Sequence, residues 1–187
     1  MIFIVENYLI QMIICSSNLS FQDFSFKKFI SYSDKIGITN VEIAPKLILN
    51  NFLNHNLKKN IKEILKKNNS TIISLQSIFF DARNPNNCNI EKLKKTFLKN
   101  IKFANFFKIK KISLGSCPTR QLKINYEELK KVNLYFVREL CNIAHKENIT
   151  ICMEPIHEKY NNNFLNNHSE LLNFIKNVRK KKLKDAF

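Results

Sequence analysis

The chain has 187 residues, a length that suits one domain. Its 44% hydrophobic content and 16 phenylalanines can form a large core, which excludes a disordered chain. The formal net charge is +16, but paired lysines are spread over every predicted helix instead of forming one stripe. We therefore expect a solvated basic surface, with an anion-binding surface as the alternative, and we expect neither nucleic acid nor a membrane as partner.

Short apolar runs alternate with longer amphipathic segments along the chain. The pattern predicts strands at 12–15, 40–44, 71–75, 111–114 and 149–153, and helices at 26–35, 56–68, 90–106, 126–146 and 169–179. Ser25 is a suitable N-cap for the first helix, and Gly37 follows its end. Each strand is thus followed by a helix, which predicts a parallel sheet with helices outside.

Five βα units are recognisable, and a sixth strand is expected to begin within 183–187. A closed (β/α) barrel needs eight units and about 250 residues. We therefore predict an α/β fold of the (β/α) TIM-barrel type with about five of the eight units, in which residues 1–187 form a single domain that is incomplete at its C-terminus. The alternative is a complete open, doubly wound sheet, but the residues after the first strand, 16–19, lack the glycine-rich phosphate turn of that class.

The five cysteines are odd in number and show neither a CxxC pair nor a zinc-ligand spacing. A reducing, cytoplasmic location is the simplest inference. Cys15 and Cys152 lie in apolar runs, so we expect both to be buried. The apolar N-terminal segment contains Glu6 and is too short to span a membrane.

A carboxylate stands at the end of the fifth predicted strand. The apolar run 149–153 is followed by Glu154, and Pro155 then ends the strand. In a (β/α) barrel, the C-terminal ends of the strands carry the active site. Glu154 is therefore the leading candidate for a functional residue, and a solvated strand-end carboxylate is the alternative.

Four segments at successive strand ends resemble the sugar phosphate isomerase/epimerase family of the xylose isomerase-like TIM-barrel superfamily. They are Gly37–Pro45, Ser74–Phe80, Gly115–Arg120 and Cys152–Phe164. The third segment has one extra residue, Cys117, before its proline. Together the four segments extend the resemblance over nearly all of the chain.

The resemblance implies an enzyme of carbohydrate metabolism that moves a proton next to the carbonyl of a keto sugar, a sugar phosphate or a related hydroxy-carbonyl compound. Glu154 would be its catalytic base and a ligand of a divalent metal cation, Mn²⁺ or Mg²⁺, because hard cations favour carboxylate oxygens. The family takes further ligands from later strands that this chain lacks. Glu154 is thus expected to be one ligand of a site that the chain does not complete.

Five further residues are candidates for substrate binding: Glu42, Gln76, Arg120, His157 and Tyr160. Glu42 and Gln76 end strands, so they are expected to contact substrate hydroxyls, with a salt bridge and a loop cap as the respective alternatives. Arg120 is expected to grip a phosphate or carboxylate, or else to brace its loop.

His157 follows Glu154 at a spacing that would suit a metal pair on a helix, but Pro155 argues against a helix there. We expect His157 to be a loop residue that contacts substrate. Tyr160 is expected to form a wall of the sugar pocket or to pin the loop on hydrophobic neighbours.

Two other interpretations remain open. The chain is an inactive truncated remnant, or half of a split barrel that needs a complementing chain or a homo-oligomer. Alternatively, it is a DNA repair enzyme related to the apurinic-site endonucleases, which share this barrel and would benefit from the basic charge. Against the second interpretation, the third strand offers Gln76 where a ligand histidine is expected.

Overall fold

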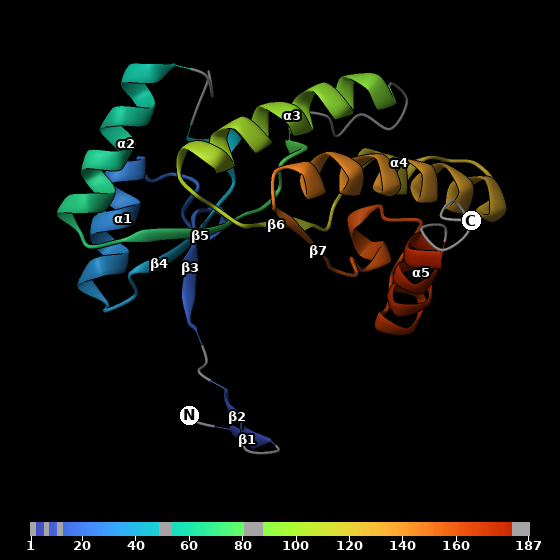
Figure 1. The fold of residues 1–187 in the computed structure, drawn as a ribbon, viewed down its shortest axis with the longest axis horizontal. Coiled ribbons are helices and arrows are strands. Elements are labelled where there is room, and N and C mark those ends of the chain that lie inside the picture. The colour runs from blue at the N-terminus through green and yellow to red at the C-terminus, as the bar shows by residue number, and fades with distance from the viewer. Residues whose placement is uncertain (1–2, 6–7, 11–12, 49–53, 81–87, 181–187) are drawn as a thin grey trace.

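A computed structural model describes residues 3–5, 8–10, 13–48, 54–80 and 88–180. Five strands form a parallel sheet in sequence order: β3 (Cys15–Ser17), β4 (Asn40–Ile43), β5 (Thr71–Leu75), β6 (Lys111–Leu114) and β7 (Thr150–Met153). A helix follows each strand: α1 (Phe26–Lys35), α2 (His55–Lys67), α3 (Ile90–Phe106), α4 (Tyr126–Lys146) and α5 (His168–Lys180). Figure 1 shows these helices succeeding one another around the sheet. This confirms the predicted series of five βα units of a (β/α) barrel.

The element bounds agree closely with the pattern, with two differences at the N-terminus. The first strand of the sheet is Cys15–Ser17 and not the predicted 12–15. Ser16 and Ser17 thus belong to the strand and not to the loop after it. A separate antiparallel pair, β1 (Phe3–Val5) with β2 (Tyr8–Ile10), was not predicted, and Figure 1 shows it away from the main sheet. The sixth strand expected within 183–187 lies outside the described residues.

The same pair of caps delimits each of the first four helices. At the N-termini, the side chains of Ser25, Asn54, Asn89 and Asn125 accept hydrogen bonds from the backbone N–H three residues later. At the C-termini, Gly37, Asn69, Lys108 and Asn148 have positive φ angles. For α3, Lys108 N–H donates to Asn105 O over 3.2 Å, and Ile109 N–H donates to Ala104 O over 2.8 Å, which defines a Schellman motif.

The two faces of the sheet differ in chemistry. Ser16 hydrogen-bonds Ser33 of α1, so alternate residues of β3 point toward the helices. Val41, Ile43 and Leu114 are fully buried in the core between sheet and helices. The opposite, inner face carries polar and small side chains, including Glu42, Ser74, Ser113, Cys15 and Cys152.

The expected burial of Cys15 and Cys152 is wrong, since both are exposed. Each lies on one of the two outermost strands of the described sheet, and pairing in register places Cys152 beside Ser113 on the inner face. The apolar runs that contain them predicted strands covered on both faces, as in most parallel sheets, whereas here the helices cover one face. Within the described ranges, no helix is both long and apolar enough to cross a membrane.

The helix C-caps yield a stability prediction. Lys108 holds a left-handed conformation (φ 59°) that costs a side-chain-bearing residue about 1 kcal/mol, so Lys108→Gly should raise the free energy of unfolding by about that amount. The control is Lys99→Gly at an exposed position inside α3, which should lower it by about 1 kcal/mol. Urea unfolding measures both. Equal destabilisation by the two substitutions would contradict the assigned cap.

Candidate active site

Two glutamates lie at the C-terminal ends of the strands, where the inner face opens. Glu42 belongs to β4, and its Oε1 accepts hydrogen bonds from Ser74 Oγ (2.6 Å) and Ser113 Oγ (3.1 Å). These serines come from β5 and β6, so two neighbouring strands orient one carboxylate oxygen. The structure thus places Glu42 in a hydroxyl-lined setting on the inner face.

Glu154 directly follows β7 and shares this mouth. Its side chain is exposed to the open inner face but packs closely on Gly115, where a Cβ atom would lie 2.0 Å from Glu154 Oε1. The pKa of Glu154 is raised, first by partial burial and second by repulsion from Glu42, while the positive charge of Arg120 lowers it. The structure therefore places Glu42 near enough to Glu154 for its charge to disfavour the ionised form of Glu154.

Arg120 is 1% exposed and lies in η5 (Pro118–Gln121), the turn after β6. Its Nη1 donates to the backbone carbonyl of Glu154 (2.9 Å), and its Nη2 donates to that of Leu114 (3.1 Å). Burial lowers the pKa of Arg120. Since the guanidinium is enclosed by the protein, we assign Arg120 to bracing the ends of β6 and β7 rather than to gripping a substrate anion.

On the β3 side of the mouth, Gln76 donates a hydrogen bond to Ser17 Oγ. Next to it, the buried Asn18 accepts from Ala44 N–H (2.7 Å) and donates to Ala44 O (3.2 Å), which ties the end of β4 to the loop after β3. The sequence analysis missed Ser17 and Asn18, although a polar pair directly after an apolar run was a usable signal for strand-end contacts.

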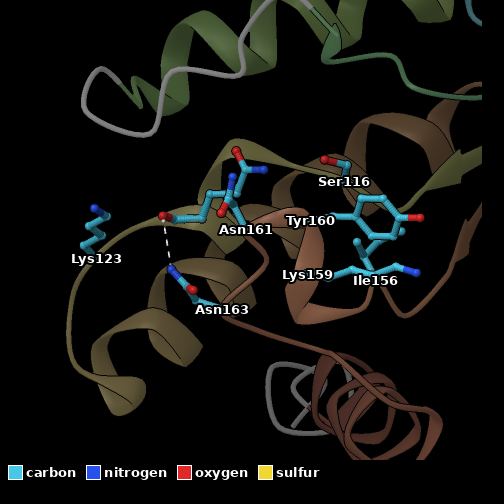
Figure 2. A pocket seen from close by; sticks show the side chains of 8 residues that line it. Ser116, Lys123, Ile156, Lys159, Tyr160, Asn161 and Asn163 are labelled. Atoms are coloured by element: carbon cyan, nitrogen blue, oxygen red, sulfur yellow. Dashed lines mark hydrogen bonds between the residues drawn. The ribbon is translucent and has the colours of Figure 1, made fainter.

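The loop after β7 holds the two remaining candidates. His157 is exposed and caps η6 (Glu158–Tyr160), its Nδ1 accepting from Lys159 N–H over 3.2 Å. The side chain of Tyr160 is 62% exposed. It borders a pocket of about 760 Å³ formed with the loop after β6 (Figure 2). The lining residues are Ser116, Gln121, Lys123, Ile156, Lys159, Tyr160, Asn161 and Asn163.

The donor set for a metal ion is incomplete in the described ranges. They contain no group of three or more histidine, cysteine or acidic side chains that could hold a metal ion. The mouth offers Glu154 and Glu42, and one oxygen of Glu42 already accepts two hydrogen bonds. Structural divalent sites need more oxygen donors than this pair supplies. The described residues therefore do not by themselves fit a divalent cation.

Residues 30–185 match the profile of the xylose isomerase-like TIM barrel family. The chain belongs to this family. No curated protein matches the sequence significantly.

Solved structures share the fold at low sequence identity. The IolI protein with a bound zinc atom has a TM-score of 0.72 at 18% identity, over 89% of this chain and 59% of that one. D-psicose 3-epimerase with D-tagatose from Clostridium cellulolyticum H10 has a TM-score of 0.71 at 17% identity, over 90% and 60%. A family 2 AP endonuclease from Brucella melitensis has a TM-score of 0.68 at 14% identity, over 90% and 65%. The chain therefore spans roughly six-tenths of these proteins, and at these identities the likeness establishes the fold alone.

The raised pKa of Glu154 predicts a pH-dependent stability difference. The folded state favours protonated Glu154, so this carboxyl stabilises the fold below its unfolded-state pKa, and that stabilisation is lost as pH rises through its raised folded-state pKa. Glu154→Gln removes this titration. The unfolding free energy of the variant relative to the wild type should therefore increase as pH rises.

Urea unfolding at a series of pH values measures this difference. Glu158→Gln, which removes a negative charge from the exposed η6 turn, is the matched control. A difference that stays constant or falls with pH would contradict the described environment of Glu154.

The bracing role of Arg120 predicts a large loss of stability on its removal. Arg120→Met leaves two carbonyls without their charged donor, so the free energy of unfolding should fall by about 3 kcal/mol. The pKa of Glu154, measured by NMR titration, should rise further because a nearby positive charge is lost. Arg120→Lys keeps the positive charge but lacks the planar fork. It should therefore change the Glu154 pKa little while still lowering the free energy of unfolding. Full stability of Arg120→Met would overturn this role.

Proposed function

We propose that this chain carries the acid–base half of an isomerase or epimerase site, which moves a proton on the carbon next to a carbonyl of a keto sugar or related hydroxy-carbonyl compound. The observation that carries the proposal is Glu154, a carboxylate at the mouth of the strands whose pKa is raised by its surroundings. Membership of the xylose isomerase-like family and the structural likeness to D-psicose 3-epimerase support this class of reaction.

In the proposed reaction, the Glu154 carboxylate takes a proton from the carbon beside the carbonyl and becomes a carboxylic acid. It then returns a proton to the substrate. A raised pKa makes the carboxylate a stronger base than an ordinary glutamate and brings it nearer to neutral pH, where such transfer is efficient. Glu42, oriented by Ser74 and Ser113, contributes by repulsion, which protonation of Glu154 relieves.

A divalent cation such as Mn²⁺ or Mg²⁺ polarises a carbonyl when it is bound beside one. The zinc atom of IolI makes such an ion reasonable for a member of this family. Because the described residues do not complete a ligand set, we assign no step to a cation, and Glu154 as a metal ligand stays a proposal. Substrate contacts by Glu42, Gln76, His157 and Tyr160 are likewise proposals, as is a cytoplasmic location.

The other interpretations keep distinct consequences. A remnant or half-barrel would bind or turn over substrate only with a complementing chain or a second copy. A DNA repair activity would draw on the AP endonuclease likeness and on the net charge of +16. One observation argues against the DNA alternative. The residue after β5 is Gln76, which hydrogen-bonds Ser17, and not a histidine that could bind a metal ion.

The test is solvent-proton exchange. The 187-residue chain, incubated in D₂O with a panel of keto sugars and their phosphates, should incorporate deuterium beside the carbonyl, as followed by proton NMR. Glu154→Gln removes the base and should slow exchange by about 100-fold or more. Glu158→Gln, a carboxylate in the same loop, is the control and should exchange at the wild-type rate.

The proposal is contradicted if Glu154→Gln exchanges as fast as the wild type. It is also contradicted if the chain gives no exchange on any substrate but incises DNA that contains an abasic site.

A further inference from the structure

The pocket between the loops after β6 and β7 is not used by the proton-transfer chemistry described above. Its walls are fixed to each other by hydrogen bonds. Asn163 N–H donates to Arg120 O over 2.9 Å, and Asn163 Nδ2 donates to the carbonyls of Gln121 and Leu122, each over 3.3 Å. The loop that carries Asn163 is therefore tied to the turn that carries Arg120, so the pocket is already formed without a ligand.

The pocket adjoins Glu154. Ser116, in its wall, follows Gly115, on which the Glu154 carboxylate packs. Ile156, also in the wall, lies two residues beyond Glu154. The pocket therefore lies beside the strand end that carries Glu154.

Figure 2 shows that the lining residues are arranged along the pocket. Ser116, Tyr160, Ile156 and Lys159 gather at one end, and Lys123 and Asn163 lie at the other. Tyr160 supplies an exposed ring at the first end, and Lys159 Nζ lies 5.1 Å from the centroid of that ring. The pocket thus has an aromatic end, where Tyr160 and Lys159 lie, and an opposite end where Lys123 is the cationic side chain.

The charges of the pocket favour an anion. Two of its eight lining residues are lysines and none is acidic. Within the described ranges, no carboxylate pairs with Lys123, whereas Lys94 and Lys130 on the helices have glutamate partners. An ammonium without a partner, in a concave site, is suited to bind a phosphate as a point charge.

Resting on the proposed function, we propose that this pocket selects phosphorylated substrates. Lys123 binds the phosphate monoester, Tyr160 packs against the carbon chain, and Ser116 hydrogen-bonds a hydroxyl beside the reacting carbon at Glu154. The phosphate site is therefore Lys123, an exposed lysine, and not the buried Arg120. A volume of about 760 Å³ accommodates a sugar together with its phosphate.

The chain offers a direct reporter, because it contains no tryptophan. Tyr160→Trp keeps an aromatic ring in the pocket and makes it the single strongly fluorescent residue. Titration with D-fructose 6-phosphate should give a saturable change in emission, with an affinity at least about tenfold higher than for D-fructose. Inorganic phosphate should compete. Tyr135→Trp, at an exposed position on α4, should show no change.

Lys123→Ala in the Tyr160→Trp background tests the phosphate contact. It should lower the affinity for D-fructose 6-phosphate by about tenfold and leave the affinity for D-fructose unchanged. The control is Lys99→Ala, at an exposed lysine of α3, which should alter neither affinity. Calorimetric titration of the unsubstituted chain with the same two ligands makes the comparison independent of the reporter.

Equal affinity for the two ligands, no effect of Lys123→Ala, or an equal effect of Lys99→Ala would overturn the proposal. Glu154→Gln should retain binding. Selective binding without proton exchange would therefore refute the proposed reaction alone, and exchange without phosphate selectivity would refute this pocket assignment alone.

Discussion

A buried positive charge with backbone partners organises the candidate site. Both terminal nitrogens of Arg120 donate hydrogen bonds to backbone carbonyls, those of Leu114 and Glu154. The carbonyl of Arg120 itself accepts a hydrogen bond from Asn163 N–H. One side chain thus joins the ends of β6 and β7, and its backbone joins the loop beyond. A charged group is costly to bury unless its hydrogen bonds are satisfied, so these partners must stay in place while the chain is folded. The orientation of Glu154 and the shape of the neighbouring pocket both depend on that arrangement.

The two faces of the sheet differ in what they contribute: the covered face forms the core, and the open face carries the candidate site residues. The side facing the helices is apolar, and its burial holds the five βα units together. The inner side presents hydroxyls and carboxylates, and Glu42 is held there by serines from two adjacent strands. Side chains alternate between the two faces along each strand, so one residue packs in the core while its neighbour in sequence lies on the open face.

Most of the fold was predictable from local signals, and most of the site was not. The limits of α1, α3 and α4 matched the pattern because caps such as Ser25 and Asn125 mark helix starts in the sequence itself. Glu154 could be singled out as a candidate because a strand end and a proline flank it. The direction of the Arg120 side chain was not predictable, since its carbonyl partners come from distant residues. The exposure of Cys152 was missed because an apolar run does not reveal which face of a strand is covered.

The chain uses glycine at only two positions, 37 and 115. At three other helix ends, asparagine or lysine accepts the left-handed conformation that glycine would adopt without strain. A strained backbone angle is a graded cost, but an atom 2.0 Å from a carboxylate oxygen is an overlap that would force that carboxylate to move. In a sequence with only one other glycine, Gly115 therefore marks the space that the Glu154 side chain occupies. Gly115, directly after β6, thus leaves the room that the Glu154 side chain takes at the end of the neighbouring strand β7.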